Sequence, residues 1–203
     1  GNTTVSGNST TSGNLTITGG NTTVAGDSTA TNLTIAGGNT SVAGNTTVSN
    51  LTVSGGSVTS QGTLSAGNVT QSNGTLTASS NMTVSGNLTQ TGGNATVVGN
   101  TTVIGDTTLA GNTTVGNLST ANMTITDGNT TVSGNSTTSG NLTIAGGNTT
   151  VAGDTTVGNL SQSNGTLTTN GNLTVNGNLT QTGGNATVAG NTTVIGDTTL
   201  AGN

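Results

Sequence analysis

The chain has 203 residues, and its five aspartates are its only ionisable side chains, which gives a formal net charge of −5 at pH 7. It contains no lysine, arginine, histidine, cysteine, proline or aromatic residue. An imidazole base, a thiol nucleophile and a cation for phosphate are therefore missing, so we expect no enzymatic activity, no cofactor and no binding to nucleic acid. The sequence also lacks the long apolar run that membrane insertion requires.

The chain opens with three versions of one six-residue phrase, Gly-Asn-x-Thr-Val-x. Within the phrase, threonine at the fourth position alternates with β-branched or aliphatic residues at the third and fifth. This period of two predicts a short strand whose third and fifth side chains point inward. Glycine permits a tight bend, and the asparagine beside it can bond to local backbone. Each phrase therefore predicts one strand and one corner.

A doubled or substituted glycine follows every third phrase, and these pairs recur with a period of about 18 to 19 residues, interrupted by one double interval. Such a period is typical of solenoids, whose units bury surface only by stacking on neighbours. We therefore predict an all-β fold, a triangular β-solenoid of about 11 coils with three strands per coil. Residues 1–203 are expected to form one repetitive domain, a segment of a longer fibre. The pairs begin at Gly19, Gly37, Gly55, Asn73, Gly92, Asp127, Gly146, Asn164 and Gly183.

Bulky aliphatic residues gather at the inward positions of the third phrase, whereas the first two phrases supply mostly threonine, serine, alanine and valine. We therefore predict a thin core with one bulkier side, so that the backbone ladder between coils carries much of the ordering. The third-phrase pairs include Leu15/Ile17, Leu33/Ile35, Leu51/Val53, Met123/Ile125 and Leu142/Ile144.

Four glutamines, Gln71, Gln90, Gln162 and Gln181, also occupy inward positions of the third phrase, and they form two pairs whose members lie one period apart. A buried glutamine needs hydrogen-bond partners, and the glutamine one coil away could supply them as an amide ladder. The alternative is a local strand shift that turns these side chains outward.

Asn-x-Ser/Thr occurs 27 times, which makes the corner asparagines candidates for N-glycosylation. The alternative is arithmetic, because the repeat Gly-Asn-x-Thr creates the motif wherever asparagine marks a corner. The candidates we single out are Asn2, Asn8, Asn14, Asn21, Asn32 and Asn45.

Three aliphatic residues, Val98, Ile104 and Ile195, fall at outward positions and are candidates for lateral contacts between rods. The aspartates replace single corner asparagines or open a coil, so we expect no metal site, because a hard cation needs several converging oxygens. They are Asp27, Asp106, Asp127, Asp154 and Asp197.

The strings at residues 147–160 (GNTTVAGDTTVGNL) and 171–185 (GNLTVNGNLTQTGGN) resemble low-complexity shaft repeats of phage and giant-virus tail fibres, and the β-solenoid stalks of large secreted bacterial adhesins. The six-residue rhythm is also similar to that of left-handed β-helix acyltransferases, whose catalytic histidine this chain lacks. The fibre resemblance implies a non-enzymatic role outside the cell, on a cell surface or on a virion surface, often as a trimer or a bundled filament.

We therefore expect a structural shaft whose main partner is itself, through axial stacking or lateral bundling. Three alternatives stay open: a surface adhesin stalk that binds glycans, an ice-binding β-solenoid, and a trimeric tail-fibre shaft in which three chains intertwine. The period of three phrases favours a coil formed by a single chain, because an intertwined trimer needs only the single phrase.

Overall fold

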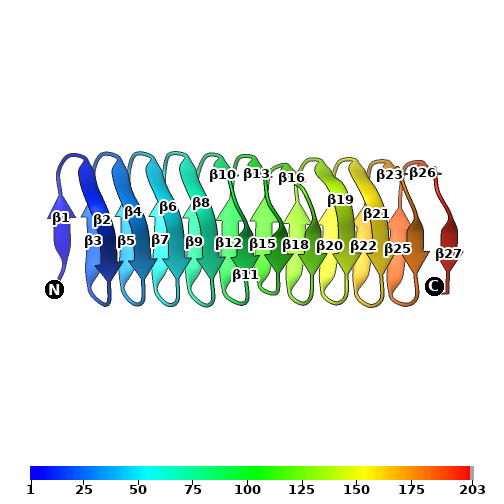
Figure 1. The fold of residues 1–203 in the computed structure, drawn as a ribbon, viewed down its shortest axis with the longest axis horizontal. Helices are drawn as coiled ribbons and strands as arrows, with labels where there is room; N and C mark the ends of the chain where they lie inside the picture. Colours follow the sequence, from blue (N-terminus) through cyan, green and yellow to red (C-terminus); the bar gives the residue numbers. More distant parts are fainter. Residues whose placement is uncertain (202–203) are drawn as a thin grey trace.

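A computed structural model describes residues 1–201, and every regular element in this range is a β-strand (Figure 1). The chain winds through about 11 turns into a straight rod, with its two ends at opposite ends of the rod. The strand pairings are parallel, and each joins residues one turn apart. No helix capable of crossing a membrane occurs in this range. The predicted all-β solenoid is confirmed.

The first strand of each coil lies in an 11-stranded parallel sheet that forms one side of the rod. We number the coils by these strands and call this surface the first side. The strands are β1 (Thr3–Val5), β3 (Asn21–Val24), β5 (Asn39–Val42), β7 (Ser57–Ser60), β9 (Thr75–Ala78), β12 (Asn94–Val97), β15 (Asn112–Val115), β18 (Asn129–Val132), β20 (Asn148–Val151), β22 (Thr166–Thr169) and β25 (Asn185–Val188).

The second and third sides belong to one 16-stranded parallel sheet. In six coils a single bent strand covers both sides: β2 (Ser9–Ile17), β4 (Ser28–Ile35), β6 (Thr46–Val53), β8 (Leu64–Gln71), β19 (Ser136–Ile144) and β21 (Thr155–Gln162). In the other five the two sides are separate strands: β10 (Met82–Val84) and β11 (Leu88–Gln90), β13 (Thr101–Val103) and β14 (Thr107–Leu109), β16 (Leu118–Thr120) and β17 (Met123–Ile125), β23 (Leu173–Val175) and β24 (Leu179–Gln181), β26 (Thr192–Val194) and β27 (Thr198–Leu200). The second corner is therefore a bend within one sheet.

Along the strands, buried and exposed residues alternate as the phrase predicts. In β5, Thr40 and Val42 are buried while Asn39 is exposed. The register places each residue beside its equivalent in the next coil, so Thr40 pairs with Thr22 on one side and Val58 on the other. Equivalent positions therefore stack in columns along the rod.

Corner length explains why some coils are one residue longer than others. At the second corner of the first coil two residues separate Thr11 from Asn14, whereas one residue separates their partners Ala30 and Asn32. The strand pairing continues in register on both sides of this difference. An extra residue is thus absorbed at the corner and leaves the sides unchanged.

The third corner, which leads to the next coil, relies on glycine in a left-handed conformation. Gly38 has a φ of +75°, and a Cβ atom there would overlap the carbonyl oxygen of Gly20 in the preceding coil. Both observations require glycine. Within residues 1–201, nine third corners share this feature, but the corner at Gly111, which is one residue shorter, does not.

The core is less lopsided than the sequence predicts. In three of the four coils whose third side carries a buried glutamine, the first two sides supply buried Leu64, Leu76, Met82, Leu167 and Leu173. The glutamine takes space from aliphatic side chains on the third side, and larger residues opposite restore the packed volume.

Candidate functional surfaces

The four predicted glutamines are buried and point into the rod. The side-chain Nε2 of Gln71 donates to the carbonyl oxygens of Gly74 (3.1 Å) and Asn94 (2.7 Å), and Gln90 makes the same bonds to Gly93 (3.1 Å) and Asn112 (3.0 Å). Gln162 and Gln181 likewise donate to the glycine three residues ahead. These nitrogens therefore bind main-chain carbonyls at the third corner, where the sequence suggested an amide ladder.

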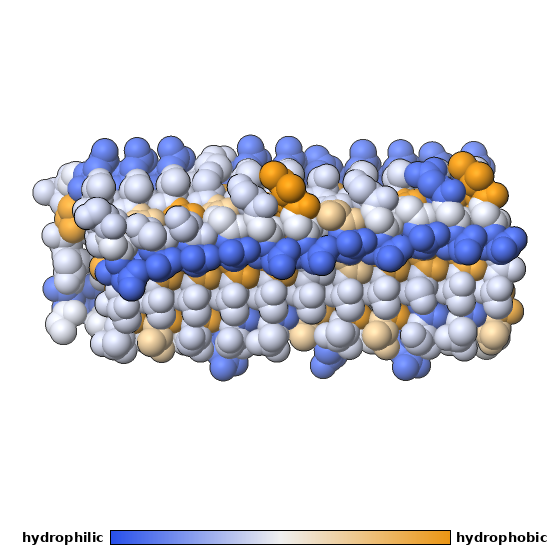
Figure 2. All heavy atoms as spheres, in the orientation of Figure 1, coloured by the Kyte–Doolittle hydropathy of each residue, from blue (hydrophilic) through white to orange (hydrophobic). Residues whose placement is uncertain are grey.

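Asparagine and aspartate form columns at the corners. Figure 2 shows a hydrophilic row that runs the length of the rod. The second-corner column consists of Asn14, Asn32, Asn50, Asn68, Asn87, Asp106, Asn122, Asn141, Asn159, Asn178 and Asp197. Their side chains link consecutive coils by hydrogen bonds, so the columns supplement the backbone ladder.

The bond in this column depends on corner length. Where the next coil has the shorter second corner, its side-chain amide donates, as from Asn50 Nδ2 to Asn32 Oδ1 (2.7 Å). Where that corner is one residue longer, the backbone donates instead, as from Asn87 N to Asn68 Oδ1 (2.9 Å). In both cases the side-chain Oδ1 of the residue in the preceding coil accepts the hydrogen bond. This shared role explains why asparagine recurs at a regular spacing.

The six candidate glycosylation residues all belong to such corner networks. Oδ1 of Asn2, Asn8, Asn21 and Asn45 accepts a backbone N–H from the next coil, and Oδ1 of Asn14 and Asn32 accepts a side-chain amide. Most are exposed and Asn32 is half-buried. Their linking role accounts for the repeated motif, and glycan attachment stays a prediction.

Four of the five aspartates stand where asparagine otherwise stands, and the fifth, Asp127, opens a coil. Asp27 donates its backbone N–H to Asn8 Oδ1 (2.8 Å) and accepts from the backbone N–H of Asn45 (2.7 Å), as an asparagine would. Among residues 1–201 there is no group of three acidic side chains that could hold a metal ion.

Large hydrophobic side chains project from the rod at few places. Val98 is 68% exposed, Ile104 67% and Ile195 72%, and Leu200 in the last described coil is also exposed. On the face drawn in Figure 2, hydrophobic projections are separated by polar surface. Ile104 and Ile195 follow β13 and β26, so they lie at equivalent places on the second side, five coils apart.

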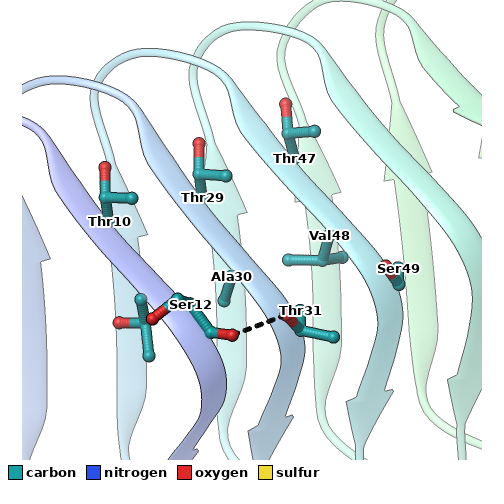
Figure 3. Close-up of a pocket in the computed structure, with 9 residues that line it drawn as sticks. Thr10, Ser12, Thr29, Ala30, Thr31, Thr47, Val48 and Ser49 are labelled. Atoms are coloured by element: carbon teal, nitrogen blue, oxygen red, sulfur yellow. Dashed lines mark hydrogen bonds between the residues drawn. The ribbon is translucent and has the colours of Figure 1, made fainter.

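A shallow trough runs along the second side over coils 1 to 5, and Figure 3 shows the side chains that line its first stretch. Its two stretches enclose about 340 and 400 Å³. Between its rims runs the backbone of Ala30, Val48 and Ala66, whose side chains are almost fully buried in the core. One rim consists of Thr10, Thr29, Thr47, Ser65 and Thr83, and the other of Ser12, Thr31, Ser49, Gly67 and Ser85.

Sequence reasoning did not identify this trough. The available signal is a small apolar residue between two small polar residues, as in Thr29-Ala30-Thr31 and Thr47-Val48-Ser49. The rims of the trough present mainly the hydroxyl groups of serine and threonine. The trough can therefore accept a surface by shape and hydrogen bonds.

No family model matches the chain, and no curated protein or solved structure matches it.

Proposed function

We propose that the protein is a non-catalytic structural shaft of an extracellular or virion-surface fibre. The observation that carries this proposal is the unbroken parallel ladder, which joins 11 strands on the first side and continues through every coil of the other two. Corner columns of asparagine add a second set of bonds between coils. A repetitive rod with few features besides its length is suited to spacing and support.

The dimensions follow from strand geometry. Neighbouring strands lie roughly 4.8 Å apart, so about 11 coils make a rod roughly 50 Å long. The hydrogen bonds of the ladder run along the rod axis, and each coil contacts only its neighbours. Length can therefore be changed by whole coils without altering the cross-section.

Burial within one chain favours a single-chain shaft over three intertwined chains. Leu33, Ile35 and Leu51 are fully buried by strands of the same chain. An intertwined trimer would complete the core with residues from two other chains, and here one chain encloses it.

Self-assembly supplies the proposed fibre. Most side chains of β1 and of β25 to β27 are exposed, and their outer strand edges are open to further pairing. In the proposed shaft, further coils from the same polypeptide or from another copy continue the ladder, and lateral contacts bundle the rods.

Cryo-electron microscopy of the assembled protein, combined with intact mass, tests the shaft. We expect single-chain coils repeating at about 4.8 Å along a continuous axis. Three chains around one axis would overturn the single-chain shaft, and mass in excess of the polypeptide at asparagine would establish glycosylation.

The adhesin and ice-binding alternatives predict different measurable binding properties for the same rod. A stalk that itself binds glycans should retain oligosaccharides on a glycan array. An ice-binding surface should produce thermal hysteresis, although the second outward row on the trough side is mixed, with Ser12, Ser85 and Ile104 in it. Either positive result would argue for a binding role in place of a purely structural one.

A further inference from the structure

Four asparagines of the chain are followed directly by glycine, and all four are exposed: Asn73, Asn164, Asn170 and Asn176. A glycine has no side chain to crowd its backbone nitrogen, so that nitrogen can approach the side-chain amide of the asparagine before it. Attack of the nitrogen on the amide carbon expels ammonia. Each Asn-Gly pair is therefore a place where asparagine can be converted into an acidic residue, provided that the glycine nitrogen is free to move.

Two of the four glycine nitrogens are held by the ladder. Gly171 and Gly177, which follow Asn170 and Asn176, lie at the first and second corners of coil 10. Their N–H groups donate to carbonyl oxygens of the preceding coil, at 3.1 Å and 2.6 Å. Attack by either nitrogen requires this bond between coils to break first, and the corner must open with it.

The other two glycines, Gly74 and Gly165, lie at third corners, with φ of +83° and +78°. Within residues 1–201 neither of their N–H groups makes a hydrogen bond. No bond between coils therefore has to break before these nitrogens can react. The pairs at Asn73 and Asn164 thus differ from the other two in the one group that attacks.

A third corner of the same kind shows that the side chain can reach this nitrogen. Asp127 precedes Gly128, whose φ is +72°, and Asp127 Oδ1 accepts the Gly128 N–H at 2.7 Å. The carboxyl carbon is one bond from that oxygen, so it lies within about 4 Å of the nitrogen. This is close to the roughly 3–3.5 Å separation from which bound atoms react.

We propose that Asn73 and Asn164 are sites of spontaneous deamidation in the folded rod, and that the fold protects Asn170 and Asn176. The glycine nitrogen forms a bond to the asparagine Cγ, the Cγ–Nδ2 bond breaks, and ammonia leaves with the glycine proton. Water then opens the cyclic imide at either of its two carbonyl carbons. The products are aspartate and isoaspartate, and each event adds one negative charge to a chain whose formal charge is −5.

The two products have different consequences for the rod. Aspartate is accommodated, because Asp127 already stands at the equivalent place in another third corner. Isoaspartate adds a carbon atom to the main chain beside Gly74, where even a Cβ atom would overlap the carbonyl oxygen of Gly56. Formation of isoaspartate at Asn73 therefore disturbs the stacking of coils 4 and 5, whereas formation of aspartate leaves it intact.

Incubation of the whole folded chain in mildly alkaline buffer, followed by peptide mass spectrometry, measures the four sites side by side. Each deamidation adds about 1 Da to its peptide. We expect Asn73 and Asn164 to react at least about 10-fold faster than Asn170 and Asn176, whose glycines must first leave the ladder. The same chain unfolded in urea is the control, and there the four rates should be similar.

Equal rates at the four sites of the folded chain, or faster reaction at Asn170 or Asn176, would overturn the proposal. A folded chain that keeps all four asparagines while the unfolded chain loses them would overturn it as well. The comparison needs no substitution, so it does not depend on whether a variant folds.

Matched variants assign the mass gain to its sites. Asn73→Gly introduces the residue that most third corners have at this position, and Asn170→Ala introduces the residue that coil 9 has at the equivalent Ala152. Both chains should keep the circular dichroism spectrum of the rod. Asn73→Gly should remove about half of the early mass gain, because the two reactive sites are far apart and independent. Asn170→Ala should leave the gain unchanged, and an equal loss in the two variants would refute the assignment.

Discussion

Coil 3 (residues 39–56) and coil 7 (residues 112–128) have the same three sides but differ by one residue in length. Coil 7 is shorter at its first corner, where Asn117 donates its side-chain Nδ2 to Asn100 Oδ1 (2.8 Å). The equivalent Asn45 in coil 3 donates its backbone N–H to Asp27 Oδ1 (2.7 Å). Both coils keep inward and outward alternation on all sides. The corners therefore accommodate differences in coil length, whereas the strands of the sides keep their register.

An insertion tests this difference between side and corner most severely. One alanine inserted between Leu33 and Thr34 of β4 would turn Ile35 outward, because a one-residue slip exchanges the two faces of a strand. We expect the melting temperature by circular dichroism to fall by roughly 10 °C or more.

The matched control places one glycine between Thr31 and Asn32, which gives coil 2 the longer second corner that coil 1 already has. The melting temperature should change by no more than about 2 °C. Comparable losses from both insertions would show that the corners do not absorb length.

Glycine substitutions compare a regular third corner with the short one. Gly38→Ala combines a positive φ with overlap onto the Gly20 carbonyl, whereas Gly111 lacks the positive φ and its added Cβ meets Gly93 and Gln90. We expect Gly38→Ala to cost about 3–5 kcal/mol and Gly111→Ala about 1–3 kcal/mol in urea unfolding. The reverse order would contradict the importance of the left-handed corner.

Glutamine substitutions compare the short third corner with another regular one, from inside the rod. Gln90 supports the short corner through Asn112, and its Oε1 also accepts from the Thr113 hydroxyl, whereas Oε1 of Gln71 has no hydrogen-bond partner among the described residues. Gln90→Leu should therefore destabilise by about 1 kcal/mol more than Gln71→Leu. Chemical denaturation of the two variants measures the difference, and equal losses would count against a special role for Gln90.

The smallest effect is expected in the inward threonine column of coils 7 and 8. Thr130 Oγ1 is buried without a hydrogen-bond partner in residues 1–201, while Thr113 in the neighbouring coil bonds to Gln90. Thr130→Val should raise stability by about 1 kcal/mol and Thr113→Val should lower it by a similar amount. Thermal melts distinguish the two signs, and a loss at Thr130 would indicate a partner such as bound water.

Period and alternation predicted the strands, the parallel stacking and the inward residues because each depends on local sequence repeated every turn. The merger of the second and third sides was not predicted. Corner length does not account for it, because β2 and β19 are continuous across the longer second corner, whereas β16 and β17 are separate strands at the shorter one. The redistribution of core volume toward Leu76 and Met82 also escaped prediction, since it requires knowing what lies across the rod.

Among the candidate surfaces, exposure of Val98, Ile104 and Ile195 followed from their outward position in the phrase. For the glutamines the sequence left inward and outward placement open, and the structure has them buried. Their partners were not foreseen, because corner carbonyls more than one turn ahead become neighbours only after winding. The trough depends on side-chain size in consecutive coils, which single-phrase reasoning does not compare.

The direction of the ladder bonds has a mechanical consequence. These bonds point along the rod, so axial tension pulls each one in the direction in which it opens, and coils at an end should peel away one at a time. Adding coils in series lengthens the rod without increasing the force at which the first coil yields. A neighbouring rod bound along the flank would instead share that load as shear, spread over many contacts that must slide together.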